Sequence, residues 1–270
     1  MDFLYSLLSG IIQGLTEFLP ISSSGHLVII HDILKFEFFD NVLYDVGLHV
    51  ATALALTIFF RREVLVIIRG FARSLRRWDF RNDPEQRLAW LVILAALPAV
   101  AVGLVFGSVI ETTLRNPIIV AAALALVGIA FFVAEKLSAR KKAVAEMTPG
   151  DAAVIGAAQV LAFIPGVSRS GISLVAGLGR RLRREEAARF SFLLSIPTIF
   201  GAAVKTGLKV GDWSGANWPV LAVGFAAAFV SGILTIRYFL KFVARHPLNV
   251  FAWYRIGIGL LILLWLALSR

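Results

Sequence analysis

Long apolar stretches separated by short charged segments dominate the pattern of hydrophobic and polar positions along this chain. Most of them approach the roughly 20 residues that a helix needs to cross the hydrocarbon core of a bilayer. They cover residues 43–60, 88–106, 117–134, 190–204, 219–236 and 250–268. Because these stretches are rich in Ala, Leu, Val and Ile, we expect helices rather than the strands of a barrel. The pattern therefore predicts an all-α polytopic membrane protein.

Two further apolar segments are interrupted by turn-forming residues. They cover 1–35 and 151–179, and they are broken near 20–25 and 165–171 by proline, glycine and serine. Each arm has roughly 8–15 residues, which at 1.5 Å per residue is too short for a ~30 Å hydrocarbon core. We therefore expect two re-entrant helix–loop–helix hairpins, each of which enters the bilayer halfway and returns.

The overall composition agrees with a membrane protein. Hydrophobic residues make up 59% of the chain, charged residues make up 16%, and the mean hydropathy is +0.82. These values exclude a disordered chain, a soluble enzyme with a small core and a disulfide scaffold. The chain has no cysteine, so disulfides, cysteine-ligated zinc and a cysteine nucleophile are excluded as well.

The basic residues predict an orientation in the membrane. Most of the 27 Lys and Arg residues fall in four clusters, within 61–87, 136–142, 180–189 and 237–245. Positive-inside bias places these clusters in the cytoplasm and both termini outside, so we interpret them as solvated loops and expect no nucleic-acid partner. The first ten residues lack the basic region of a signal peptide, and we expect none.

This topology implies an inverted repeat within a single membrane domain, 1–270. One hairpin and three spans form repeat one, about 1–140, and a hairpin entering from the other side with three spans forms repeat two, about 148–270. The hairpins carry similar sequences, QGLTEFLPISSSG and QVLAFIPGVSRSG, if one residue is inserted after the proline. Two unrelated breaks are the alternative. Inverted repeats place broken helices face to face near the midplane, where binding sites form.

A few ionisable residues fall at membrane depth and are candidates for function, because such groups are costly there. They are Glu17, His26, Asp45, His49, Arg169 and Arg255. Glu17 lies one helical turn after Gln13 and is a structural hydrogen-bonding group, a metal ligand or a general base. Asp45 and His49 share one face of the first span and are expected to support the site from outside it. Arg255 is expected to snorkel or pair, with no role assigned.

The tip of the first hairpin carries three serines and a histidine. Ser22, Ser23, Ser24 and Gly25 precede a second helix, where hydroxyl groups cap the helix, bind an anion or do both. His26 begins that helix. Beside the serines and Glu17, a catalytic histidine is favoured over a packed one.

The tip of the second hairpin places Arg169 between Ser168 and Ser170, with Gly171 following. A buried guanidinium needs an anionic partner. Either Arg169 forms an ion pair with Glu17 across the repeats, or it clamps a phosphate through its planar fork. Helix N-termini, hydroxyls and an arginine at one point indicate an anion site, and its depth indicates a lipid-linked phosphate ester.

These motifs resemble the two signatures of undecaprenyl-diphosphate phosphatases of the bacitracin-resistance type. The first runs from Gln13 to His26 and the second from Pro165 to Gly171. The resemblance implies a bacterial inner-membrane hydrolase that converts undecaprenyl diphosphate to undecaprenyl phosphate and inorganic phosphate, which recycles the lipid carrier for peptidoglycan and other envelope polymers. Its active site would open to the outer side.

The resemblance also implies site residues and a divalent cation, magnesium or calcium. Ser23, His26, Glu17 and Arg169 would be catalytic, with Ser23 attacking phosphorus or orienting water and His26 as acid/base or nucleophile. The phosphate would be bound by Ser22, Ser24, Gly25, Ser168, Ser170 and Gly171. Glu17 would ligate the cation. Family members carry Glu or Gln at the position of Gln13, so a site built on two glutamates is in doubt here. The expected partners are the lipid substrate and membrane lipids, with a homodimer as a candidate assembly.

Two other functions use the same features. A lipid-phosphate transporter or flippase would also be built from inverted repeats with broken helices. An intramembrane serine protease could use Ser23 and His26, but it leaves Glu17 and Arg169 without a role.

Overall fold

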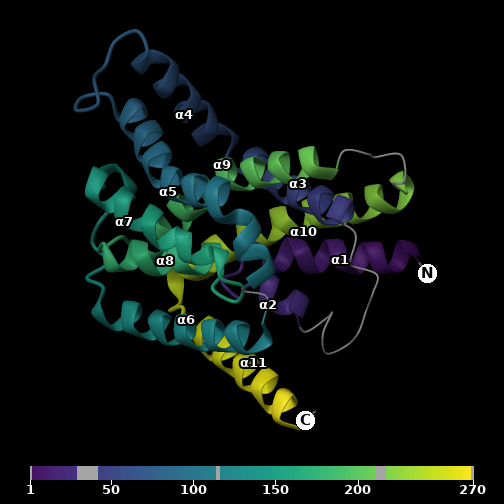
Figure 1. The fold of residues 1–270 in the computed structure, drawn as a ribbon. Coiled ribbons are helices and arrows are strands. Elements are labelled where there is room, and N and C mark those ends of the chain that lie inside the picture. Colours follow the sequence, from purple (N-terminus) through teal and green to yellow (C-terminus); the bar gives the residue numbers. More distant parts are fainter. Residues whose placement is uncertain (1, 29–41, 114–115, 211–216, 269–270) are drawn as a thin grey trace.

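The computed structural model describes residues 2–28, 42–113, 116–210 and 217–268. Helices and turns make up this part of the chain, in which the only β-pairing is an isolated bridge between Lys142 and Leu182. In chain order (Figure 1) the helices are α1 (Asp2–Thr16), α2 (Ser23–Val28), α3 (Val42–Phe59), α4 (Arg61–Ser74), α5 (Pro84–Thr113), α6 (Pro117–Leu137), α7 (Pro149–Val160), α8 (Arg169–Gly179), α9 (Arg184–Val210), α10 (Trp218–Arg245) and α11 (Asn249–Leu268). Two 3-10 turns, η3 (Val144–Glu146) and η4 (Leu161–Phe163), flank α7.

Five of these helices, α5, α6, α9, α10 and α11, are long and apolar enough to cross a membrane. They confirm the spans predicted from residue 88 onward, and with them the multi-pass all-α membrane fold. Helix α9 reaches its length by starting at Arg184, because the charged turn before residue 190 continues the same helix. Helix α3 coincides with the predicted span 43–60, but its apolar part, Leu43–Phe59, is shorter than the other five.

The segment 61–87 is not the loop that its arginines suggested. Residues Arg61–Ser74 form α4, and α5 begins at Pro84. Gly70 and Ser74, one turn apart, face α5 closely enough that a Cβ at Gly70 would lie 2.2 Å from the carbonyl oxygen of Glu85. The arginines on either side of Gly70, Arg69 and Arg73, hid the helical spacing. In Figure 1, α4 and the start of α5 form a hairpin that projects from the body.

The other basic clusters are also more structured than solvated loops. Glu135 of α6 accepts hydrogen bonds from Arg140 and Arg184, and Asp151 of α7 pairs with Lys142 and Arg180. These ion pairs join the end of α6 to the starts of α7 and α9. These basic residues therefore connect the helices at one end of the bundle, in addition to their expected effect on orientation.

Helix packing in the two halves follows the reciprocal order that an inverted repeat predicts. Helix α1 packs along α10, and α7, which holds the same position in the second half, packs along α5. Helices α6 and α11 pack on each other, as do α3 and α9. The exact repeat boundaries, 1–140 and 148–270, stay a prediction.

Small residues allow the hairpin arms to approach these long helices closely. A Cβ added to Gly10 of α1 would lie 2.2 Å from the carbonyl oxygen of Gly224 on α10. In the second half, a Cβ added to Gly156 of α7 would lie 2.4 Å from the carbonyl oxygen of Ala95 on α5. Small residues at helix contacts are typical of membrane proteins, because association there depends on close packing.

We therefore expect Gly156→Ala to destabilise the fold by roughly 1–3 kcal/mol, the usual cost of an overpacked contact. The matched control is Gly201→Ala on α9, where an added Cβ meets nothing within 4 Å. Thermal unfolding of both purified variants in detergent measures the difference. Equal stability of the two variants would contradict the close α7–α5 contact.

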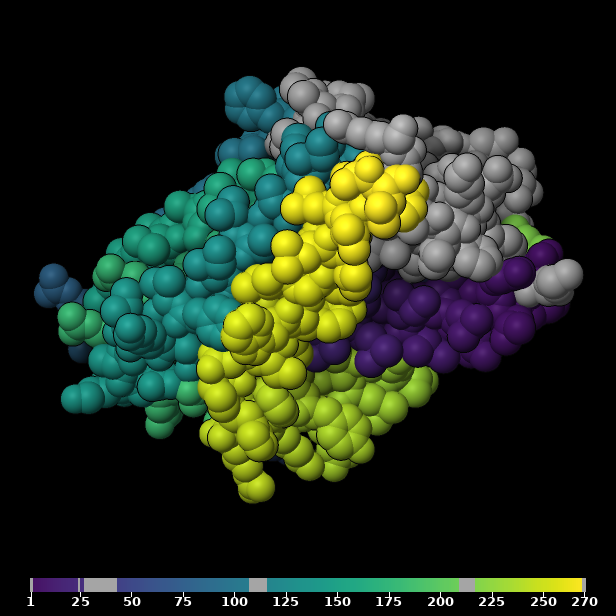
Figure 2. Space-filling model, turned by 90° about the horizontal axis from the view of Figure 1, so that it is seen from below, coloured from purple at the N-terminus to yellow at the C-terminus, as the bar shows by residue number. Residues whose placement is uncertain are grey.

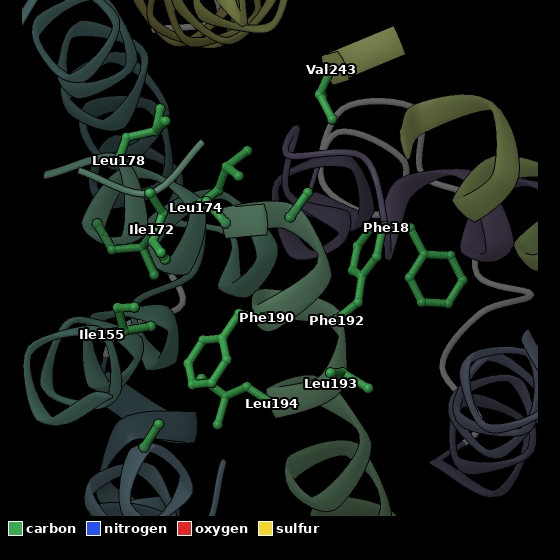
Figure 3. Packing of buried hydrophobic residues seen from close by; sticks show 14 of the residues in the cluster. Phe18, Ile155, Ile172, Leu174, Leu178, Phe190, Phe192, Leu193, Leu194 and Val243 are labelled. Atoms are coloured by element: carbon green, nitrogen blue, oxygen red, sulfur yellow. The ribbon is translucent and has the colours of Figure 1, made fainter. Parts of the chain in front are cut away.

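The hydrophobic core reaches the first hairpin tip through Phe18. Its ring packs edge-on against Phe192 of α9, with the ring centroids 5.7 Å apart (Figure 3). Phe190 and Leu194 of α9 and Leu174 of α8 belong to the same buried cluster. Since Phe18 directly follows Glu17, this packing fixes the backbone that carries the candidate carboxylate.

Candidate active site

The two hairpin tips have the same local structure, and serines build it. Ser22 has φ 74° and Ser168 has φ 70°, a left-handed conformation that is uncommon for residues other than glycine. The Ser22 hydroxyl accepts a hydrogen bond from the Gly25 N–H at 3.3 Å, and the Ser168 hydroxyl accepts one from Gly171 at 3.2 Å. Ser22 therefore caps the start of α2, and Ser168 caps the start of α8. The N–H groups of Gly25 and Gly171 point at the hydroxyl oxygens of these two serines.

The second tip also needs Gly166, which has φ 95°. A Cβ there would lie 2.5 Å from the carbonyl oxygen of Val120 on α6. The Ser170 hydroxyl lies 3.2 Å from that of Ser168 and donates to the carbonyl of Leu19 at 3.4 Å, which links this tip to the first. The side chain of Ser24 lies outside the described residues.

An ion pair joins the tips. Nη2 of Arg169 donates to Oε1 of Glu17, a contact between residues 152 positions apart in the chain. The side chains of Glu17 and Arg169 are 7% and 18% exposed. Nη1 of Arg169 donates to the Thr198 hydroxyl at 3.2 Å, while Nε is buried without a partner among the described residues. Of the two partners considered for Arg169, the carboxylate is therefore present across the repeats.

Three further side chains face the second oxygen of Glu17. Oε2 accepts a hydrogen bond from Nε2 of Gln13 at 3.1 Å and a longer one from the Ser23 hydroxyl at 3.5 Å. Nε2 of His49 lies 4.0 Å away. The structure thus brings together Gln13, Glu17, Ser23, His49 and Arg169. His49, expected to support the site from outside it, lies beside this carboxylate.

Asp45 supports this arrangement through its backbone. Its carbonyl accepts a hydrogen bond from Nδ1 of His49 at 2.8 Å, one turn along α3. Because a carbonyl only accepts, Nδ1 of His49 carries a proton and donates it to this carbonyl, which orients the ring with Nε2 toward Glu17.

His26 is held away from this cluster. Its Nδ1 donates to the carbonyl of Ser22 at 2.7 Å, and its Nε2 lies 2.6 Å from the hydroxyl of Tyr254 on α11. The two rings stack with centroids 5.7 Å apart. Both ring nitrogens are thus occupied, and within the described residues no hydrogen bond joins His26 to Ser23 or Glu17. Tyr254 had no sequence signal beyond its place in an apolar span.

Arg255 of α11, to which the sequence assigned no role, lies outside both tips and contacts each of them. It is fully buried. Its Nη1 donates to the carbonyl of Pro20 at 2.9 Å, and its Nη2 donates to the carbonyls of Gly166 at 2.6 Å and Val167 at 2.9 Å. The sequence signal for this contact was an arginine inside the apolar run 250–268. Its partners could not be found from the sequence, because they are backbone carbonyl oxygens.

The cluster offers few ligands for a divalent cation. Within the described residues, no group of three His, Asp or Glu side chains could hold a metal ion. Glu17 is the carboxylate of the cluster, and Arg169 contacts it directly. Magnesium is commonly bound by one or two carboxylates together with substrate phosphates and waters. The residues therefore fit a cation shared with a phosphate substrate, and they do not form a closed protein cage.

Comparison with known proteins shows the family of this chain. The family model for the bacitracin resistance protein BacA matches residues 6–261. The chain belongs to this BacA family. The undecaprenyl-diphosphatase of Rubrobacter xylanophilus is 43% identical over 267 residues, which cover 97% of each chain. Undecaprenyl-diphosphatases of Trichlorobacter lovleyi and Saccharophagus degradans are 41% and 39% identical over 99% of this chain. This membership confirms the resemblance drawn from the two hairpin motifs of the sequence.

Proposed function

We propose that this protein hydrolyses undecaprenyl diphosphate to undecaprenyl phosphate and inorganic phosphate. The named activity of its BacA-family relatives supports the reaction, and their names favour it over transport or proteolysis. The structural observation that carries the proposal is the contact of Arg169 with Glu17 between the hairpin tips. A guanidinium, a carboxylate and a serine hydroxyl then lie together in a bundle of membrane-spanning helices.

Arg169 is suited to bind the phosphoryl oxygens. Its Nε has no partner among the described residues, and a buried donor without a partner is unfavourable. An anionic phosphoryl oxygen would satisfy Nε and compete with Glu17 for the terminal nitrogens. The planar fork then stabilises the charge that develops on the transferred phosphoryl group.

Ser23 and Glu17 are suited to deliver the nucleophile. In one route the Ser23 oxygen attacks the terminal phosphorus and Glu17 takes the hydroxyl proton. The bond from phosphorus to the bridging oxygen breaks, undecaprenyl phosphate leaves, and water then hydrolyses the phosphoserine. In the other route Ser23 and Glu17 orient a water that attacks directly, and Glu17 takes its proton. Both routes use the contact between the Ser23 hydroxyl and Oε2 of Glu17.

His26 stays our proposed acid/base group for the same reaction. Because Ser22 and Tyr254 occupy its two nitrogens, it would exchange the Tyr254 hydroxyl for a substrate oxygen when it acts. The hydroxyls of Ser168 and Ser170 at the second tip remain candidates for binding the outer phosphate oxygens, beside their capping role.

A divalent cation, magnesium or calcium, is part of the proposal. Glu17 and the amide oxygen of Gln13 would hold it together with the diphosphate. When bound, such a cation neutralises phosphate charge and polarises the bond that breaks. We expect Glu17→Gln to weaken the binding of the cation as well as activity.

We propose a bacterial inner-membrane location, with the site open to the outer side and the prenyl chain between helices. The basic segments gather at the end of the molecule away from the N-terminus (Figure 1), where Nη2 of Arg87 donates to the carbonyl of Met147. Positive-inside bias places that end in the cytoplasm. A homodimer stays a prediction.

This orientation predicts the result of cysteine labelling, which is simple here because the chain has no native cysteine. A cysteine at exposed Arg76, after α4, should be labelled by an impermeant thiol reagent only after the cells are opened. A cysteine at exposed Asn116, at the start of α6, should be labelled in intact cells. Labelling of the Arg76 position in intact cells would reverse the proposed topology.

Phosphate release from undecaprenyl diphosphate by the purified protein in detergent tests the proposed function. We expect catalytic release of one phosphate per lipid, with undecaprenyl phosphate as the lipid product. A transporter needs two compartments and releases no phosphate in this assay. The absence of release by a folded protein supplied with magnesium or calcium would contradict the proposal.

A further inference from the structure

We infer that Arg255 is a positioning residue, because its guanidinium binds the backbone of both hairpin tips and thereby sets the separation of Glu17 and Arg169. The inference rests on the proposed function only for its kinetic test. The geometry itself concerns three backbone carbonyls, one from the first tip and two from the second.

The position of α11 makes this contact available. In Figure 2, α11 (yellow) crosses one face of the molecule between the teal segment that includes α6 and the purple α1. Arg255 points inward from this helix and is fully buried, while Tyr254 beside it contacts His26 of α2. Two consecutive residues of α11, Tyr254 and Arg255, thus contact the first hairpin, and Arg255 also contacts the second.

The carbonyls that Arg255 binds lie close to the reacting groups in sequence. Pro20 is three residues from Glu17 and three from Ser23, and Val167 is two residues from Arg169. A change in the distance between these carbonyls therefore moves Glu17 relative to Arg169. A Cβ added to Gly171 would lie 3.5 Å from Nη1 of Arg255, an ordinary van der Waals contact, so the guanidinium lies beside the start of α8.

Arginine is the side chain that this geometry requires. Its planar group presents several donors at fixed angles, and two of its nitrogens reach opposite tips here. A lysine ammonium is a single point of charge and cannot span both tips in the same way. The partners found for the guanidinium among the described residues are carbonyl oxygens, so its contacts tie backbone to backbone.

A positioning role predicts a specific kinetic pattern. Misplacement of catalytic groups by about 1 Å can lower a rate by roughly 10²-fold. We expect Arg255→Gln to lower kcat by roughly 10²-fold while KM stays within about threefold, because Arg169 still binds phosphate. Arg255→Lys should lose less than Arg255→Gln. The control Arg237→Gln, an exposed arginine of α10, should match the wild type.

A distance measurement separates positioning from a general structural role. Spin labels on cysteines at Leu8 of α1 and Val154 of α7, both exposed, report the relative placement of the two hairpins by double electron–electron resonance. The chain without other cysteines should give one narrow distance distribution, Arg255→Gln should broaden or shift it, and Arg237→Gln should leave it unchanged. If Arg255→Gln does not fold, Arg255→Lys is measured in its place.

Each outcome decides the inference. Wild-type kcat in a folded Arg255→Gln variant would overturn it, and so would a large rise in KM with kcat retained. Lost activity with an unchanged distance distribution would also overturn it, because Arg255 would then act by contact with substrate. If the wild-type protein releases no phosphate, the proposed function fails, while the distance distributions still test the link between the tips.

Discussion

Arg169→Ala is expected to lower kcat by roughly 10³-fold or more, the range found when an arginine that stabilises phosphoryl transfer is removed. The reason is that Arg169 pairs with Glu17, and its Nε, which has no partner among the described residues, can bind a phosphoryl oxygen. Phosphate release by purified protein at saturating lipid measures the loss.

Arg169→Lys should recover little of this activity, because lysine lacks the planar fork. The matched control is Thr198→Val, which removes the hydroxyl that accepts from Nη1 at 3.2 Å but keeps the guanidinium. We expect this control to lose far less activity. Near-normal turnover by folded Arg169→Ala or Arg169→Lys would remove the phosphate-binding role.

Ser23→Ala is expected to lower the rate by roughly 10²–10⁴-fold, because it removes the hydroxyl that contacts Glu17. The matched control is Ser22→Ala at the neighbouring position. Its hydroxyl caps α2 through the Gly25 N–H, so this change should cost roughly 0.5–2 kcal/mol of stability and less activity. Phosphate release and thermal unfolding of both variants test the two roles.

Acid quenching of a single turnover separates the two routes. Phosphate bound covalently to protein, and absent from Ser23→Ala, indicates that Ser23 attacks phosphorus. Full activity of Ser23→Ala would remove Ser23 from the chemistry and leave water or a histidine as the nucleophile.

The helices could largely be predicted from the sequence because membrane spans depend on local hydrophobicity. The long apolar runs, the broken hairpins and the charged candidates Glu17 and Arg169 all have local signals. Helix α4 had a weaker signal, because its arginines dominate a segment whose small residues pack on α5.

The arrangement of the site depends on tertiary contacts that no local pattern contains. The sequence could suggest an ion pair between Glu17 and Arg169, but only the packing of the two halves brings them together. The same packing places His49 beside Glu17, where it supports the carboxylate, and it places His26 against Tyr254. The role of Arg255 could not be predicted, because every residue has a backbone carbonyl and the sequence does not indicate which of them an arginine binds.

The central claim is that Glu17 and Arg169, from the two halves of the chain, form one reaction centre. A double-mutant cycle tests it most directly, with kcat/KM for phosphate release measured for wild type, Glu17→Gln, Arg169→Gln and the double variant. The effects of residues that act as a unit are not additive. The kcat/KM of the double variant should therefore be little lower than that of the less active single variant. A loss equal to the product of the two single losses would show that Glu17 and Arg169 act independently, and it would contradict a shared centre.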